Sequence, residues 1–482
     1  MEQKNKKKIS TQTIIKLLLA VVLLGLSAFL LKGDVWTFWT WWLLAGVMGF
    51  AAMPVTGRLF WRFEDKGWIF SKVLAIAATG FLTWFLTAIR LIPFNALTCA
   101  AVTILCAVIC FFLLRKESKE KTECFPVDRI SLIYWEELLF FLAFLMWTYL
   151  AGFRPAAYGT EKFMDYGFME AMMRSTTLPA RDLWYSEGHI NYYYGGQYFA
   201  VFLTKLSHTK VELTYNLMRT FVAGLAFAMP FSLVYQMMSD RMKGQQKSEK
   251  VIKGLPFAAG FTAGTAVSIA GNMHYVIYAQ IIPLIEKLTG KEVSSYWFPD
   301  ATRYIGYNPY REEDRTIHEF PCYSFVLGDL HAHVVNIMFV LLVIALLYVW
   351  LRGVRKKTVP VETSMKDGKF WKEQLLMPHL LVISALLGMF QWTNFWDFVI
   401  YYVVTLGTVL FANIIRFQGK IKKIMVVTFA QMAEIYLLAY LVILPFTLQF
   451  DTMVDGIGIA KYHSYFYQLL VLWGLPAVFT IT

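Results

Sequence analysis

Apolar runs long enough to cross a bilayer recur along the whole 482-residue chain. A transmembrane helix needs about 20 mostly apolar residues. A set of soluble domains could not bury so much apolar surface, since 57% of the residues are hydrophobic and 16% charged, against roughly 25% charged in ordinary soluble domains. The sequence therefore predicts an all-α polytopic membrane protein with about twelve transmembrane helices. The runs lie near 14–31, 35–53, 68–89, 96–114, 130–151, 212–238, 255–281, 334–351, 374–390, 398–415, 424–446 and 465–482.

Positive charge is concentrated in alternate connections between these runs. The net charge is +12, from 45 Lys and Arg against 33 Asp and Glu. If the amino terminus is cytoplasmic, the inward segments carry 28 Lys and Arg in 85 residues, and the outward segments carry 14. Cytoplasmic loops of membrane proteins show this excess, so the charge indicates topology, with the lipid bilayer and not nucleic acid as the partner. We therefore expect a multi-pass protein of the cell (plasma) membrane with a cytoplasmic amino terminus.

The chain divides by the length of its connections. Short turns join the first four runs, so we expect residues 1–129 to form an amino-terminal four-span membrane region. Residues 130–482 contain two long outward loops, 152–211 and 282–333, in which we expect short interfacial helices. Loops of that length in a compact protein are usually functional. Because the chain ends inside an apolar segment, we expect the natural protein to continue beyond it.

Acidic residues open the first long loop. Thr160 can cap a helix that begins with Glu161. Glu161 and Asp165 lie four residues apart, so they share a face of that helix. Two like charges on one face repel, which favours a functional site. The alternative is a surface helix on which Glu170 and Arg174 form a solvated pair.

A tyrosine triplet, residues 192–194, follows in the same loop. Three consecutive tyrosines can form an aromatic belt at the membrane surface. Their neighbours favour a polar ligand such as a sugar, because His189, Asn191 and Gln197 supply hydrogen-bonding groups and the glycine pair 195–196 permits close approach of a backbone.

Histidines and acids alternate before the eighth run. Asp329, His331 and His333 are spaced two apart, so an extended segment would point all three the same way. A carboxylate with two imidazoles suits a divalent ion such as zinc, manganese or iron. Two other interpretations stay open: a helix amino terminus with solvated histidines, and hydrogen bonding to a phosphate or sugar. Asn394 and Asp397 form a further polar patch that faces the same compartment in this topology.

These stretches, in this order, resemble the signature blocks of the YYY family of polytopic membrane proteins, named for its tyrosine triplet. The resemblance runs from about 130 to 450, with departures at Phe163, Ala332 and Phe395. That family is similar to the glycosyltransferase C superfamily, whose members take a sugar from a polyprenyl-phosphate carrier on the extracytoplasmic face. The blocks are residues 161–165, 190–195, 328–333 and 394–397.

The resemblance implies an inverting membrane glycosyltransferase with a polyprenyl-phosphate sugar donor and an unidentified acceptor. An acid of the first long loop would be the general base. Asp165 is preferred to Glu161, because it lies one turn into the helix, where apolar neighbours raise its basicity. Asp329, His331 and His333 would hold a divalent metal ion, the one cofactor considered. Substrate-binding residues would be Lys162, Arg174, His189, Asn191, Tyr192, Tyr193, Tyr194, Arg311, Arg315, Glu319, Asn394 and Asp397, with Arg303 as a further cation.

Two other functions are consistent with the same residues. A transporter or flippase of a lipid-linked or polar substrate would place ionisable groups inside the spans, and Glu136, Glu137, Arg219 and Glu434 are in such positions. A structural scaffold would not collect polar residues on one side of the membrane. The glycosyltransferase interpretation is therefore preferred, and the transporter is its alternative.

Overall fold

The computed structural model describes residues 10–120, 124–243, 249–355, 365–452 and 458–481. The basic residues 4–8 of the amino terminus lie outside this part. Within it the secondary structure is helical, with two isolated β-bridges and no strands. The longer helices are α1 (Thr11–Leu31), α2 (Val35–Leu59), α3 (Trp68–Ala88), α4 (Ala96–Glu120), α5 (Ile130–Ala151), α8 (Val211–Met242), α9 (Glu249–Ser268), α12 (Ala332–Val354), α14 (Pro378–Thr393), α15 (Phe395–Phe417), α16 (Ile421–Thr447) and α17 (Phe466–Ile481).

Shorter helices lie between the long ones. They are α6 (Lys162–Arg174), α7 (Gly195–Ser207), α10 (Ile282–Leu288), α11 (Pro321–Leu327) and α13 (Gly368–Gln374). Single turns add η1 (Lys32–Asp34), η2 (Val127–Arg129), η3 (Val276–Ile281), η4 (Phe298–Ala301) and η5 (Glu312–Asp314).

Eight helical segments of the described chain are long and apolar enough to span a membrane. The number becomes nine if α13 and α14, which are bent by 56°, count as one span. An integral, multi-pass membrane protein is thus confirmed, whereas the predicted number of twelve spans is not. A helix does lie at each of the twelve predicted places, but α14 and α17 have only 16 residues each.

The first two helices are separated by a sharp bend. The segment Thr11–Leu59 counts as one helical run of 49 residues, yet Lys32 has a φ of 50° at the junction. The indole nitrogen of Trp39 donates a hydrogen bond of 3.0 Å to the hydroxyl of Ser27. A straight helix would hold these residues about 18 Å apart, so the chain bends between α1 and α2, and each of these helices has the length of one crossing.

The seventh predicted run, 255–281, is wrong at its carboxyl end. α9 stops at Ser268, and regular helix resumes only with η3 and α10. The intervening residues include Gly271 and Asn272, and the side chain of Asn272 caps the backbone amide of His274 at 3.1 Å. Glycine and asparagine favour such breaks, and a count of apolar residues does not detect them.

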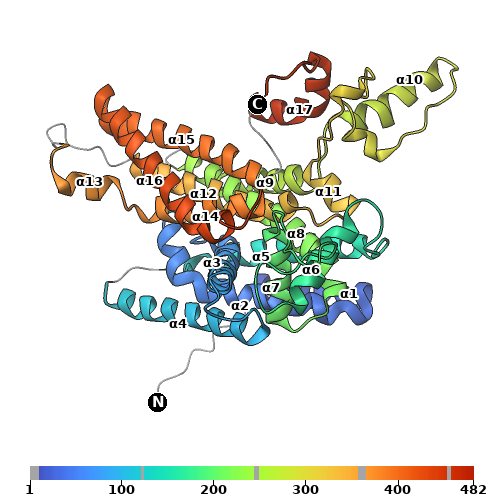
Figure 1. The fold of residues 1–482 in the computed structure, drawn as a ribbon. Coiled ribbons are helices and arrows are strands. Elements are labelled where there is room, and N and C mark those ends of the chain that lie inside the picture. The colour runs from blue at the N-terminus through green and yellow to red at the C-terminus, as the bar shows by residue number, and fades with distance from the viewer. Residues whose placement is uncertain (1–9, 121–123, 244–248, 356–364, 453–457, 482) are drawn as a thin grey trace.

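The helices form two packed groups (Figure 1). α1 to α8 make the lower group in this view, and α12 to α16 make the upper group. Helix pairs in contact include α5 with α8, α8 with α9, α2 with α3, and α14 with α16. One core cluster extends from Leu23 to Phe446 and joins the groups. The predicted division after residue 129 stays a prediction.

The short helix α7 lies in the centre of the protein. Every residue from Gly195 to Lys205 is buried, so the expectation of an interfacial helix is wrong here. The reason is that α7 packs against several helices, among them α4, α6, α8 and α12. A Cβ at Gly195 would lie 2.7 Å from the methyl of Thr393, and one at Gly196 would lie 3.2 Å from Val335. The glycine pair therefore allows close helix packing and not, as we expected, the approach of a ligand.

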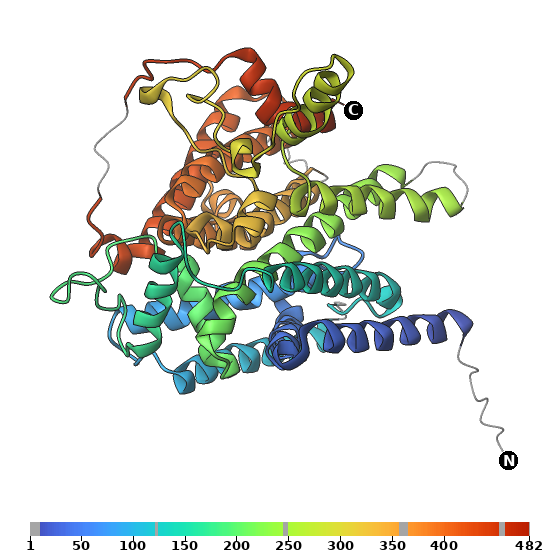
Figure 2. The same ribbon diagram turned by 90° about the vertical axis from the view of Figure 1, so that its right-hand side faces the viewer.

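The long loop after α5 lies at one end of the bundle. In Figure 2 this loop is at the left, whereas the start of α1 and the adjoining ends of α8 and α9 are at the right. The two ends of the bundle carry different polar clusters.

Candidate functional site

Helix α6 points one acid into the protein and leaves the other outside. Asp165 is 1% exposed, whereas the side chain of Glu161 is 59% exposed. The helix begins at Lys162 with Glu161 as its N-cap residue. Thr160 does not cap it as expected, because its hydroxyl donates to Asp329 Oδ1 at 2.6 Å. The surface pair of Glu170 and Arg174, which belonged to the alternative interpretation of this helix, is present at 3.1 Å.

A glutamine of α7 holds the buried acid. Gln197 Nε2 donates to Asp165 Oδ1 at 2.8 Å and to the carbonyl of Leu330 at 2.9 Å. Asp165 Oδ2 and Gln197 Oε1 are buried and have no hydrogen-bond partner. Burial raises the pKa of Asp165 to about 8, although the hydrogen bond from Gln197 opposes the shift. The negative charges of nearby Asp329 and Glu161 contribute to this rise. A carboxyl with such a pKa can take up and release a proton near neutral pH.

Two cations lie close to Asp329, at the end of α11. Gly328 ends that helix with a φ of 93°. A Cβ at this position would lie 3.2 Å from Lys162 Nζ and 3.3 Å from the guanidinium carbon of Arg219. Both cations are buried. Burial lowers the pKa of Lys162, and the negative charge of Asp329 opposes that shift.

Asp329 connects the acids of α6 with the histidines. It is 4% exposed, and its Oδ2 lies 3.4 Å from His331 Nε2. The same nitrogen lies 3.6 Å from Glu161 Oε2. Burial lowers the pKa of His331, as does the neighbouring His333.

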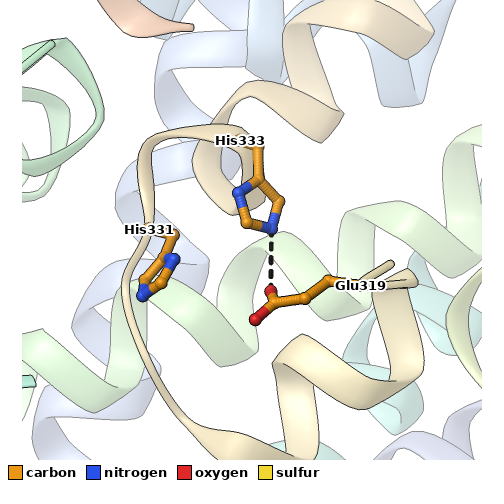
Figure 3. Close-up of side chains that lie close together, drawn as sticks. All are labelled: Glu319, His331 and His333. Atoms are coloured by element: carbon orange, nitrogen blue, oxygen red, sulfur yellow. Dashed lines mark hydrogen bonds and ion pairs between the residues drawn. The ribbon is translucent and has the colours of Figure 1, made fainter. Parts of the chain in front are cut away.

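The two histidines meet a carboxylate from farther upstream, that of Glu319 (Figure 3). His333 Nε2 lies 3.1 Å from Glu319 Oε2, which also accepts a hydrogen bond of 2.9 Å from Ser324. One ligand atom from each of Glu319, His331 and His333 lies within 4.8 Å of the others. Burial would raise the pKa of Glu319, but the two histidines and Ser324 bring it below its usual value.

The third motif is not the extended segment that its spacing suggested. His331 is the N-cap residue of α12, and His333 lies inside that helix. His331 and His333 both lie near Glu319, whereas Asp329 does not join this group. Glu319, expected among the substrate-binding residues, joins the histidines, whereas Asp329 lies on the side of Glu161.

The fourth patch forms a hydrogen-bonded network at the start of α15. Asp397 Oδ2 accepts from Asn336 at 2.6 Å and from Asn394 at 2.9 Å. Thr393 donates to the side-chain oxygen of Asn336 at 2.7 Å. The network is close enough to His333 for an electrostatic interaction with Asp397. It therefore adjoins the histidines.

The three tyrosines have different surroundings. Tyr192 is half-buried against Phe168 and interacts electrostatically with Asp165. Tyr193 lies against Phe450, with ring centroids 5.1 Å apart. Tyr194 is 2% exposed, and its hydroxyl accepts from the indole of Trp84 at 3.0 Å. Tyr192 is thus the member of the triplet next to the acids, and Tyr194 is part of the core.

Several expected substrate-binding residues make their contacts elsewhere. Arg174 pairs with Glu170 on the surface. His189 is exposed and forms an isolated bridge with Arg181. Asn191 donates to the carbonyl of Asp451 at 2.9 Å. The remaining cations contact tyrosines of the second long loop and its neighbours: Arg303 with Tyr323, Arg311 with Tyr465, and Arg315 with Tyr310.

A cavity of about 360 Å³ opens beside Glu319. Residues of α9, of the segment 318–321 and of α17 line it, and most of them are apolar. Phe320 and Trp473 belong to its wall. The polar groups from Asp165 to Glu319 thus end at a space suited to an apolar chain. We call Glu161, Lys162, Asp165, Arg219, Glu319, Asp329, His331 and His333 the acid-histidine cluster.

A second polar cluster lies at the other end of the bundle. Lys72 is buried and pairs with Glu137 at 2.6 Å. Glu137 also accepts from the indoles of Trp68 and Trp42, at 2.6 and 3.3 Å. We call Asp65, Lys72, Glu136 and Glu137 the lysine-acid cluster.

The two other acids of the lysine-acid cluster differ in their hydrogen bonding. The carboxylate of Asp65 accepts from the backbone amides of Gly67 and Trp68, at 3.1 and 2.8 Å. Glu136 is fully buried, and neither of its oxygens has a hydrogen-bond partner. The substrate-binding residues expected from the sequence do not include any member of this cluster.

The sequence interpretation missed three residues that organise the acid-histidine cluster and its neighbourhood. Gln197 was noted only as a polar neighbour of the tyrosines. Arg219 was noted only as a charge inside a span, and Asn336 was not singled out. All three are polar residues in otherwise apolar helices. Such residues commonly face the interior of the protein, which is the signal that could have identified them.

The family comparison supports the membrane assignment. A model of the family described as uncharacterized membrane protein (DUF2298) matches residues 78–482. The chain therefore belongs to this family. Neither a curated protein nor a solved structure matches it. The narrower resemblance to the YYY family and the glycosyltransferase C superfamily stays a prediction.

Proposed function

We propose that this member of family DUF2298 transfers a sugar from a polyprenyl-phosphate carrier to an acceptor hydroxyl on the extracytoplasmic face of the cell membrane. In this proposal the amino terminus is cytoplasmic and the acid-histidine cluster faces outward. One observation carries the proposal: Asp165 is a buried acid with a pKa of about 8 and an unpartnered oxygen. Its neighbour Asp329 also interacts electrostatically with the buried cations Lys162 and Arg219.

Asp165 is suited to be the general base. A base works best when its pKa lies near the operating pH. Its Oδ2 would take the proton of the acceptor hydroxyl while Gln197 holds Oδ1 in place. Glu161 and Tyr192 lie close enough to Asp165 to interact with it electrostatically. Because Asp165 is 1% exposed, neighbouring side chains must move before an acceptor can reach it.

The reaction is a direct displacement at the anomeric carbon. The acceptor oxygen forms a bond to that carbon as Asp165 takes its proton, and the bond from the carbon to the phosphate oxygen breaks. Polyprenyl phosphate leaves with the electron pair, so the configuration inverts. Paired carboxylates of the glycosidase kind are a poorer model, because Glu161 and Asp165 lie one turn apart on one helix and cannot flank a bond from both sides.

The departing phosphate needs positive charge. Lys162 and Arg219 both lie against the backbone of Gly328, where a phosphate could approach them. Arg219 donates to Asn216 Oδ1 at 2.8 Å and to the carbonyl of Phe325, while its Nε has no partner. Cations in a water-poor site stabilise developing negative charge more strongly than they would in water.

The lipid part of the donor needs an apolar space. The cavity of about 360 Å³ beside Glu319 meets this need. Its position lets an isoprenoid chain lie between α9 and α17 while the phosphate lies toward the cations. Asn394 and Asp397, next to His333, are then candidates for hydrogen bonds to the sugar.

A sugar-transfer assay with a variant of Asp165 tests the proposal. The protein is reconstituted in liposomes with radiolabelled polyprenyl-phosphate mannose or glucose and a membrane extract as the source of acceptor. Asp165→Asn removes the base but preserves the shape of the side chain. We expect sugar transfer and release of polyprenyl phosphate to fall by about 10² or more. The transfer rate of the wild type should rise with pH up to about 8.

Glu170→Gln is the matched control, because it makes the same change on the same helix at a residue that pairs with Arg174 on the surface. Its transfer rate should equal that of the wild type. Equal rates for Asp165→Asn and Glu170→Gln would exclude Asp165 as the base. A wild type that consumes neither donor while binding both would contradict sugar transfer from these carriers.

Transport is the second candidate, and one observation favours it. Lys72, Glu136 and Arg219 are buried and lie in helices long enough to span a membrane. Ionisable residues in such positions often mark a substrate or proton pathway. If the protein is a transporter, the liposomes should move the lipid-linked sugar between leaflets and leave its glycosidic phosphate bond intact.

A further inference from the structure

We propose that Glu319, His331 and His333 bind one divalent transition-metal ion. The residues come from two segments, since Glu319 precedes α11 and the histidines start α12. In Figure 3 the side chains of Glu319 and His333 point toward each other, and His331 lies beside them. One ligand atom from each residue lies within 4.8 Å of the others.

The spacing of the donor atoms suits a small ion. Zinc binds nitrogen and oxygen at about 2.1 Å, so its ligand atoms in a tetrahedral site lie roughly 3.4 Å apart. His333 Nε2 and Glu319 Oε2 already lie 3.1 Å apart. The donor atom of His331 lies within 4.8 Å of both and would have to move closer to bind the same ion. The carboxylate is also held in place, because the hydroxyl of Ser324 donates to Glu319 Oε2 at 2.9 Å.

The surroundings of His331 resemble the support that metal-binding histidines have. Such a histidine usually gives its second nitrogen to a carboxylate or carbonyl, which fixes the orientation of the ring. His331 Nε2 is buried without a hydrogen-bond partner, 3.4 Å from Asp329 Oδ2. Asp329 is itself fixed by the hydroxyl of Thr160. Asp329 thus fits the role of a supporting carboxylate and not that of a direct ligand.

The donor types select the class of ion. Two imidazoles and one carboxylate suit zinc, manganese or iron, whereas magnesium and calcium prefer oxygen ligands. Three protein ligands also leave at least one coordination position open for a further oxygen. The metal site does not depend on the proposed sugar transfer, because its occupancy is measured without any sugar substrate.

Metal binding to the purified chain tests this inference. Any histidine tag is cleaved, the protein is treated with a chelator, and Zn²⁺ or Mn²⁺ is added in equilibrium dialysis with metal analysis. We expect about one equivalent to bind. Glu319→Gln and His333→Ala should each lower the affinity by about 100-fold, and Asp329→Asn by about 10-fold, as for a supporting residue. Co²⁺ in place of zinc should give visible absorption bands that His333→Ala removes.

The exposed His463 supplies the matched control, since His463→Ala also removes one imidazole. It should bind metal like the wild type. Binding of less than a tenth of an equivalent to the wild type would overturn the proposal, as would equal affinities for Glu319→Gln and His463→Ala. If Glu319→Gln does not fold, Glu319→Asp is used in its place. This variant keeps a carboxylate on a shorter side chain and should bind the metal more weakly than the wild type. An unchanged affinity would refute the site.

Discussion

The acid-histidine cluster and the lysine-acid cluster both place carboxylates inside an apolar helical bundle. In the lysine-acid cluster, Glu137 has an ion pair and two indole donors, and Asp65 has two backbone amides. In the acid-histidine cluster, polar atoms of Asp165 and His331 lack a hydrogen-bond partner. Buried polar groups are normally satisfied, because each unsatisfied one costs roughly 1–3 kcal/mol.

This difference in hydrogen bonding distinguishes polar residues that hold helices together from polar residues that are available to a ligand. Lys72 and Glu137 connect α3 to α5 and use their charge within the protein. Asp165 keeps a carboxylate oxygen free at the cost of stability, as functional sites often do. Glu136 is the exception at the lysine-acid end, because both of its oxygens are unpartnered.

The largest expected effect comes from breaking the ion pair of the lysine-acid cluster. Lys72→Met leaves Glu137 without its cation, and removal of one partner from a buried pair costs about 3–5 kcal/mol. We expect a clear fall in melting temperature in detergent. The double variant Lys72→Met with Glu137→Gln should recover part of the loss. If Lys72→Met melted like the wild type, this pair would not hold the helices together.

A second, smaller effect depends on pH and concerns Asp165. Its pKa is about 8 in the folded protein, and about 3.9 is usual for an unfolded chain. The folded state therefore binds the proton more tightly, and stability is lost as pH rises toward 8. Relative to Asp165→Asn, the free energy of unfolding should fall by about 1.4 kcal/mol per pH unit between pH 6 and 8.

Unfolding in detergent at several pH values measures this difference. Burial also raises the pKa of Asp65. Because Asp65 is present in both proteins, its contribution to the pH dependence cancels in the difference between them. Parallel curves for the wild type and Asp165→Asn would show that Asp165 is ionised throughout this range. The unpartnered oxygen of Asp165 would then not distinguish the acid-histidine cluster from the lysine-acid cluster.

The smallest effect is expected on the surface of α6. Glu170 and Arg174 form an exposed ion pair one turn apart. Such pairs contribute about 0.3–0.5 kcal/mol. Arg174→Ala should therefore leave the melting temperature almost unchanged. A large loss of sugar transfer in this variant would instead place Arg174 in the substrate site, as the sequence interpretation expected.

The helical membrane class could be predicted from the sequence, because apolar runs long enough to cross a bilayer are typical of transmembrane helices. The sequence predicted the boundaries less well. The run 255–281 includes a break after Ser268, where short-range preferences of Gly271 and Asn272 prevail over hydropathy. The burial of α7 was missed as well, since its packing depends on contacts with α12 and α14 that are far away in sequence.

The site could be predicted only in part. The four motifs held the acids and histidines that the structure brings together, because such residues are conspicuous next to apolar runs. Their partners could not be derived, since Gln197 bonds to Leu330 across 133 residues. Glu319 takes the place beside the two histidines that we expected for Asp329, because a helix begins at Ala332. A prediction based on alternation along a strand does not include such a helix start.

The link from Gln197 to Leu330 also has a consequence for biosynthesis. The carbonyl that completes this arrangement is translated 133 residues after the glutamine. At about 5–20 residues per second, that interval is roughly 7–27 seconds. During this time the ribosome has delivered Asp165 but not the segment that helps to bury it. The nascent chain must therefore carry an open, hydrated carboxylate at the membrane until α11 and the start of α12 arrive.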